Sequence, residues 1–166
     1  MMRALLLALS LGCLTSAMGQ LKAKVKCPDL YVDVLNGTVN EQKANYTQGE
    51  IKEKFPCFTS VVEEAPDAKC GGGVFFKDKD VYFYTKRHYI EIGPKFIGKF
   101  SIVLLGTKRG GLFKSLGNPK IKDDLWEAFD TQYGTLVLHY DVKGAAGKVK
   151  MIQMSTEGTD TLQLCE

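Results

Sequence analysis

The sequence has few of the residues that enzymes use most for proton transfer, since its 166 residues include only two histidines, His88 and His139. Histidine is the side chain whose ordinary pKa places its titration near neutral pH, so this scarcity removes the commonest general base. The HExxH, GxSxG, Walker and dinucleotide-binding glycine motifs are also absent. The sequence therefore predicts a protein that is not an enzyme, with a small hydrolase or nuclease as the enzymatic alternative.

The two histidines lack the neighbours that catalysis would need. His139 lies two residues before Asp141 in an expected strand, so the two side chains share a face, but no nucleophile accompanies them. His88 follows Lys86 and Arg87 in what we expect to be a solvated basic turn. A structural or solvent-facing histidine is the favoured interpretation at both positions.

Long apolar segments are also missing, since no stretch reaches the eighteen or so residues of a membrane-spanning helix. The first nineteen residues instead have the three parts of a secretory signal: Arg3, a mostly apolar run over residues 4–14, and the small residues Ala17 and Gly19 before a cleavage point. We expect residues 1–19 to be a cleaved signal peptide and the protein to be secreted. It would then act in the extracellular space.

A second interpretation of this leader is a lipoprotein signal. Residues 10–13, which end in Cys13, loosely resemble the box in which a cysteine becomes the lipidated first residue. The apolar run continues past Cys13, which favours ordinary cleavage. The mature chain would then begin at Gln20, whose amine can cyclise to a blocked end.

The remaining chain, residues 20–166, has the composition of one globular domain. Hydrophobic residues make up 45% of the sequence and charged residues 25%, with a formal net charge of +3. Disordered acidic chains have far fewer apolar residues, so that class is excluded. A length of this order predicts a single secreted domain.

Four cysteines remain after the leader, and an even number in an exported chain predicts two disulfides. They are Cys27, Cys57, Cys70 and Cys165. Three pairings are possible, and we favour Cys57 with Cys70 and Cys27 with Cys165. A metal site is disfavoured because no pair has CxxC spacing and no histidine lies near a cysteine, and no cofactor is expected.

Two glycosylation sequons lie close together in a polar stretch. Asn36 begins Asn-Gly-Thr and Asn45 begins Asn-Tyr-Thr. Either triplet could arise by chance, but two in one exported chain predict a glycosylated surface segment. The protein is therefore expected to be a glycoprotein.

Turn and cap residues predict two short helices. Thr47 and Glu50 have the spacing of a capping box, and Pro56 ends the segment. Thr107 could cap a second helix that ends at Gly117. Strands are expected over residues 30–34, 74–76, 81–84, 89–92, 100–105, 125–129, 135–140, 148–154 and 161–164.

This pattern predicts an α+β fold: an antiparallel-sheet-rich single domain with two short helices. The order of a capped helix followed by a glycine-led hairpin, beginning at Gly73 and again at Gly134, repeats at an offset of about sixty residues. That repeat suggests a tandem helix-plus-hairpin duplication. The alternative is that caps and glycine turns recur in any α+β protein.

Residues 107–154 also carry a pattern of a known family. Leu116-Gly117-Asn118-Pro119, Trp126, Phe129, residues 134–138 and Gly147-Lys148-Val149 resemble the "LGxP, aromatic strand, GxLxVxF, GKV" pattern of SmpA-type outer-membrane assembly lipoproteins. β-Lactamase-inhibitory proteins are built on a similar helix-plus-hairpin unit. The resemblance implies a partner-binding module without enzymatic activity.

The expected hairpin over residues 74–84 concentrates aromatic and basic side chains. Residues of one parity, such as Phe75, are expected to face the core, and those of the other parity, such as Phe76, to face outward. Exposed aromatic residues beside charge are typical of binding hot spots. The residues expected to bind an extracellular protein partner are Phe76, Tyr82, Tyr84, Lys86 and Arg87.

Two other binding functions remain open. A carrier of a small apolar ligand would close its strands into a barrel lined by Phe75, Phe83, Ile102, Leu104 and Leu136. The many lysines between residues 77 and 122 could bind an anionic surface, although lysines also form the ordinary solvent face of strands. No nucleic-acid partner is expected.

Overall fold

The computed structural model describes residues 25–65 and 71–164. The expected signal peptide, the expected start at Gln20, Cys70 and Cys165 lie outside the described residues. Within the described ranges, no helix is both long enough and apolar enough to cross a membrane.

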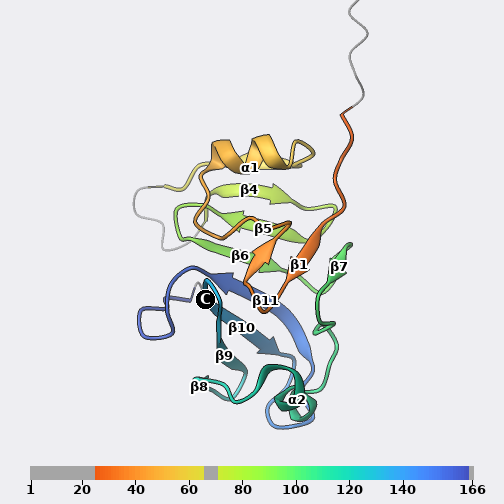
Figure 1. Cartoon of the computed structure of the whole chain (residues 1–166), viewed down its shortest axis with the longest axis vertical. Helices are drawn as coiled ribbons and strands as arrows, with labels where there is room; N and C mark the ends of the chain where they lie inside the picture. The colour runs from red at the N-terminus through yellow and green to blue at the C-terminus, as the bar shows by residue number, and fades with distance from the viewer. Residues whose placement is uncertain (1–24, 66–70, 165–166) are drawn as a thin grey trace, which may run out of the picture.

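Eight strands form one fully antiparallel sheet in the order β3-β4-β5-β6-β11-β10-β9-β8. Figure 1 shows most of this order from top to bottom. The bounds are β3 Ser60–Val62, β4 Gly73–Phe76, β5 Val81–Tyr84, β6 Tyr89–Ile92, β8 Ile121–Lys122, β9 Trp126–Thr131, β10 Gly134–Tyr140 and β11 Val149–Ser155. The expected antiparallel α+β fold with two short helices is confirmed.

The large sheet consists of two similar halves. Helix α1 (Gln48–Lys54) precedes the meander β3 to β6, and helix α2 (Phe113–Leu116) precedes the meander β8 to β11. The halves meet where β6 pairs with β11, with Ile92 opposite Ile152. In the second half, the hairpin that occupies the same position in the sheet as β4–β5 is therefore β9–β10, which begins at Trp126. The expected repeat placed this hairpin at Gly134 instead.

A second, three-stranded sheet lies over the middle of the large one. It has the order β2 (Thr38–Val39), β1 (Tyr31–Asp33) and β7 (Lys99–Phe100), and β1 pairs with β7 in parallel. Its Val32 and Val39 belong to the same buried cluster as the large sheet, and Figure 1 shows β1 in front of the middle strands. The inner face of the large sheet, which faces this cluster, carries Val74, Phe76, Val81, Phe83, Ile90, Ile92, Leu136, Leu138, Ile152 and Met154.

Helix α1 forms where the sequence predicts it. Thr47 caps the helix, because its Oγ1 accepts from the Glu50 amide and the Glu50 carboxylate accepts from the Thr47 amide at 2.8 Å. Its Ile51 and Phe55 are buried, and the Phe55 ring lies 5.9 Å from the Phe76 ring. The helix therefore covers the inner face of the first half.

Three expected elements differ from the structure. Residues 100–105 do not form a buried strand: β7 ends at Phe100 and Val103 is 71% exposed. Leu104 is the one fully buried residue, and Phe100, Ile102 and Leu105 are partly buried against the core. Thr107 does not cap a helix, because its hydroxyl donates to the Val103 carbonyl and a 3-10 turn, η1 (Arg109–Gly111), leads into α2. Residues 161–164 form a turn and an irregular segment in place of an edge strand.

One disulfide joins Cys27 to Cys57, with a Cα–Cα distance of 5.5 Å. It corrects the favoured pairing of Cys57 with Cys70 and of Cys27 with Cys165. Cys27 lies in the segment before β1, which runs past the end of α1 close to Cys57. No local sequence pattern reveals that these two segments lie side by side. Of the three possible pairings, the one that contains Cys27–Cys57 leaves Cys70 for Cys165, both outside the described residues.

We expect the mature protein to contain no free thiol, with the second bridge joining Cys70 to Cys165. Because Cys27 and Cys57 are 30 residues apart, replacing both with alanine is expected to lower the free energy of unfolding by about 3–4 kcal/mol, mainly through the entropy of the unfolded chain. Thiol titration in denaturant without reductant, followed by peptide mapping, tests the pairing. Two reactive thiols per chain would contradict the second bridge.

The two sequons differ in accessibility. Asn45 is exposed in the loop before α1. Asn36 is half-buried, and its Nδ2 donates to the Asp33 carboxylate at 2.8 Å. Asn45 therefore offers the more accessible acceptor, while glycosylation at either position stays a prediction.

Candidate functional site

The face of the large sheet opposite the core is the candidate site, and we call it the outer face. Helices α1 and α2 both lie on the inner side, where Ile51, Phe55 and Leu112 join the core. The outer face is formed by the alternate residues of each strand. They include Phe75, Tyr82, Tyr84, Tyr89, Glu91, Gln153, Met151, Val137, His139 and Trp126.

The structure reverses the expected orientation of the first strand of the hairpin. Phe76 is 2% exposed and packs against Phe55 and Phe83 in the core, so it is not a surface binding residue. Phe75 lies on the outer face instead, although neighbouring rings leave it only 9% exposed. All three residues from Val74 to Phe76 are apolar, so composition did not reveal which parity enters the core.

Four aromatic rings form a continuous cluster on the outer face. The Phe75 ring lies 5.6 Å from Tyr82 and 5.3 Å from Tyr84, and Tyr84 stacks on Tyr89 at 4.4 Å. Burial, with a smaller effect from the nearby Glu91 carboxylate, raises the pKa of Tyr84 to about 12. Tyr82 and Tyr84 therefore lie together on this face, half-buried and un-ionised at neutral pH.

A row of polar contacts continues from this cluster across the sheet. Tyr82 lies directly opposite Glu91, and Glu91 directly opposite Gln153. The Gln153 amide donates to Glu91 at 3.3 Å, and its Oε1 lies 2.9 Å from Nε2 of His139. His139 in turn lies opposite Trp126. Neither Glu91 nor Trp126 was expected at the binding site: Trp126 entered only through the family pattern, and the one local signal for both was their parity within the strands.

The basic turn between β5 and β6 lies at one end of this face. Lys86 is exposed, whereas Arg87 is tied down, since its Nε donates to the Glu64 carboxylate at 2.8 Å. His88 has a φ of 51° and lies 3.6 Å from Glu157. Of the two basic residues expected to bind a partner, Arg87 therefore also has a structural role.

The end of the described chain crosses the outer face. Residues 162–164 lie against Tyr89, Val137, Gln153 and Ser155, on the three middle strands. This contact explains why Val137 and Gln153 are buried on a face that carries no helix. Half-buried side chains flank it on both sides, with Tyr82 and Glu91 on one side and Trp126 and His139 on the other.

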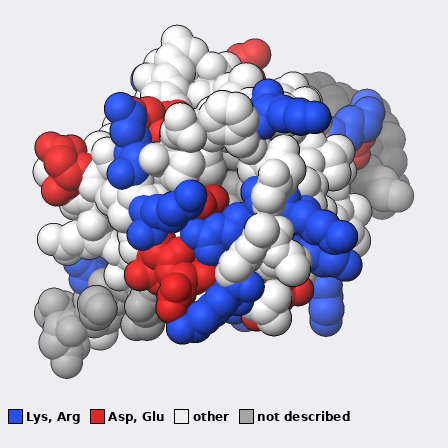
Figure 2. Space-filling model, turned by 90° about the horizontal axis from the view of Figure 1, so that it is seen from below, with Lys and Arg blue, Asp and Glu red and all other residues white. Residues whose placement is uncertain are grey.

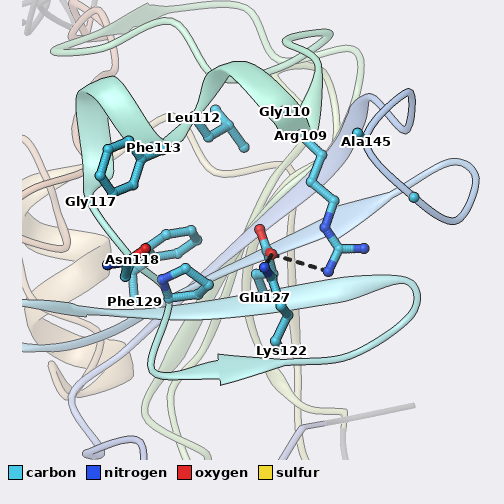
Figure 3. Close-up of a pocket in the computed structure, with 12 residues that line it drawn as sticks. Arg109, Gly110, Leu112, Phe113, Gly117, Asn118, Lys122, Glu127, Phe129 and Ala145 are labelled. Carbon is cyan, nitrogen blue, oxygen red and sulfur yellow. Dashed lines mark ion pairs between the residues drawn. The ribbon is translucent and has the colours of Figure 1, made fainter.

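A groove of about 360 Å³ lies at the other end of the molecule, between η1–α2 and β8–β9 (Figure 3). One wall is apolar, with Leu112 and Phe129 buried and Phe113 62% exposed at the mouth. Figure 3 shows Arg109 reaching down toward Glu127 at the other wall. The groove is therefore part apolar and part charged.

The charges at this wall are largely satisfied within the protein. Nη2 of Arg109 lies 3.1 Å from Glu127, which also accepts from the Tyr140 hydroxyl at 2.6 Å. The guanidinium donates to the carbonyls of Asp123 and Asp124 and lies 4.7 Å from the Tyr140 ring centre. Burial and the nearby Glu127 carboxylate raise the pKa of Tyr140. The cluster ties the η1–α2 segment to the sheet.

Some of the lysines expected to bind an anion, namely Lys108, Lys114, Lys120 and Lys122, lie at this end but are interspersed with acids. Figure 2 shows Lys and Arg side chains around a smaller acidic group. Lys120 lies 3.3 Å from Asp130, and Lys143 pairs with Asp124, which lowers the pKa of that carboxyl. These pairs reduce the net positive field that an anionic partner would meet.

His139 and Asp141 have different hydrogen-bond partners among the described residues. Its Nε2 meets Gln153, while the Asp141 carboxylate accepts from the Lys148 amide at 2.7 Å. No group of three or more His, Cys, Asp or Glu residues in the described ranges could hold a metal ion.

Comparisons with known proteins find no matching family model, no matching curated protein and no matching solved structure.

Proposed function

We propose that this chain is a secreted, non-enzymatic protein that recognises another extracellular protein through the outer face of its large sheet. The observation that carries this proposal is the four-ring cluster beside half-buried polar side chains on the one sheet face that no described helix covers. Tyrosine and tryptophan offer large, rigid contact areas, and charge-rimmed aromatic patches are typical of binding sites.

The arrangement of the two halves is consistent with the proposed resemblance to β-lactamase-inhibitory and SmpA-type modules. Each half is a helix followed by a four-stranded meander, and the halves join into one sheet. Such an open sheet offers a broad face, which suits a protein partner. The leader, the disulfide and the sequons support secretion.

A carrier of a small apolar ligand is the second candidate, and the structure gives it less support. The described strands do not close into a barrel, because β3 and β8 are separate edges of the large sheet. Phe83, Leu104 and Leu136, expected to line a cavity, pack together in the core, while Phe75 lies on the opposite face. Saturable binding of an apolar dye, displaceable by fatty acids, would favour the carrier.

The proposed function predicts that a face variant, Tyr82→Ala with Lys86→Ala, loses its partner while it keeps its fold. Lys86 is exposed, and Tyr82 is half-buried against Phe75 on the outer face, outside the core cluster, so the melting temperature should fall only slightly. Proteins retained from extracellular fluid by the immobilised wild type are identified by quantitative mass spectrometry, and the affinity of the purified partner is then measured. We expect at least tenfold weaker binding by the face variant.

The matched control is Tyr133→Ala with Lys114→Ala, which removes the same two residue types at exposed positions away from the outer face. The control should bind as the wild type does. Equal binding by the face variant and the wild type would refute recognition through this face.

A further inference from the structure

Two buried carboxylates of this protein each have an arginine, and a third, half-buried carboxylate does not. Glu64 meets Arg87 at 2.8 Å and Glu127 meets Arg109 at 3.1 Å. Glu91, on the outer face, has a hydrogen bond from Gln153 but no ion pair with any cation of the described residues. A carboxylate removed from water without a cation is a net cost to the fold.

Tyrosines lie on two sides of Glu91 along the outer face. Tyr82 lies directly opposite Glu91 on β5, and Tyr89 lies two residues before it on the same face of β6. Tyr84 stacks on Tyr89 and extends the ring surface toward Phe75. The face of an aromatic ring carries negative electrostatic potential, so it adds to the attraction of the carboxylate for a cation.

The charge near Glu91 is opposite in sign to that of the whole chain. The protein carries a formal net charge of +3, but the charge of a second acid, Asp80, is close enough to Glu91 to help raise its pKa. Its Oδ1 accepts from the Tyr82 hydroxyl at 3.1 Å, and its Oδ2 accepts from the Lys95 amide at 2.7 Å. Asp80 is thus held by its own hydrogen bonds, and Glu91 is the carboxylate with acceptor capacity to spare.

We propose that an arginine side chain of the protein partner docks on the outer face, stacked against Tyr82 and paired with the carboxylate of Glu91. This inference rests on the proposed function and names the chemistry of the contact. Arginine fits better than lysine, because its flat guanidinium can stack on a ring while its N–H groups meet a carboxylate in the same plane. The complex would supply to Glu91 what Arg87 and Arg109 supply to Glu64 and Glu127.

The free protein keeps Glu91 at a cost in stability. Burial, opposed by the hydrogen bond from Gln153, raises the pKa of Glu91. A group with a raised pKa in the folded state loses stabilisation as the pH rises through that pKa. The isosteric change Glu91→Gln should therefore leave the protein at least as stable as the wild type at pH 7, so the variant separates binding from folding.

The test uses the full mature protein, labelled with ¹³C in its tyrosine rings, and the probe acetyl-Gly-Arg-Gly-amide. We expect the probe to shift the signals of Tyr82 and Tyr89 saturably in the millimolar range. The citrulline peptide, which has the same shape without the charge, should give shifts at least tenfold smaller. Glu91→Gln should abolish the saturable shifts, and Glu53→Gln, on the exposed side of α1, should keep them.

The absence of saturable shifts in the wild type, or equal shifts in Glu91→Gln, would overturn the inference. Affinities of the face variant and of Glu91→Gln for the purified partner distinguish failure of the arginine contact from failure of the proposed function. Tenfold or greater loss in both the face variant and Glu91→Gln supports both proposals. If only the face variant loses affinity, the arginine contact is refuted. If both variants keep the wild-type affinity, recognition through this face is refuted.

Discussion

Replacing Arg109 with leucine is expected to lower the free energy of unfolding by about 3–5 kcal/mol, because it leaves a buried carboxylate without its main cation. Glu127 is only 4% exposed and would keep the Tyr140 hydroxyl and Lys122, whose Nζ is 3.8 Å away and largely in solvent. The carbonyls of Asp123 and Asp124 would also lose a charged donor. Urea denaturation followed by circular dichroism measures the loss.

The double variant Arg109→Met with Glu127→Leu is the control for this prediction. It removes both charges, so no buried carboxylate is left unpaired and part of the loss should be recovered, while the buried Tyr140 hydroxyl still loses its acceptor. Lys122→Ala should cost less than about 1 kcal/mol, because that lysine is exposed. An Arg109→Leu variant as stable as the wild type would show that the cluster does not hold the η1–α2 segment to the sheet.

Replacing Phe76 with alanine is expected to cost about 3–5 kcal/mol, because it leaves a cavity between α1 and the first half of the sheet. The Phe76 ring packs against Phe55 at 5.9 Å and Phe83 at 5.8 Å. Phe75→Ala is the matched comparison: it removes the same side chain one position away, on the outer face, where the neighbouring tyrosines can partly close over the gap.

The two phenylalanine variants test the orientation of β4 directly. A larger loss of unfolding free energy at Phe76 than at Phe75, measured under the same conditions, would agree with the structure. The reverse order would restore the expectation that Phe76 faces the solvent and would move the candidate binding face to the other side of the sheet.

Local chemistry in the sequence was enough to predict most elements near their observed bounds. The capping box of Thr47 and Glu50 satisfies backbone groups within four residues, and Pro56 cannot continue a helix, so both signals act without tertiary help. Gly117, with a φ of 75°, ends α2 as expected. The hairpin β4–β5 and the strands β6, β9, β10 and β11 likewise follow from runs of apolar residues between polar turns.

The same local signals failed where an element depends on a distant partner. Residues 100–105 have the apolar composition of a buried strand, but β7 pairs only with β1, and the chain turns away after Phe100. Composition reports how much apolar surface a segment carries, whereas pairing decides where that surface goes. The expected strand at residues 161–164 failed for the same reason.

The sequence by itself determined the class of this protein: a single antiparallel-rich α+β domain with two short helices, whose cap, turn and strand signals are local. Only the tertiary structure decided which parity of β4 enters the core, which cysteine meets Cys27, and that Glu91 lies beside tyrosines with no ion pair to a described residue. The first two properties depend on contacts between residues far apart in the chain, since Phe76 packs on Phe55 and Cys27 bonds to Cys57. The third depends on the register of neighbouring strands, because Glu91 meets Tyr82 only through the pairing of β5 with β6.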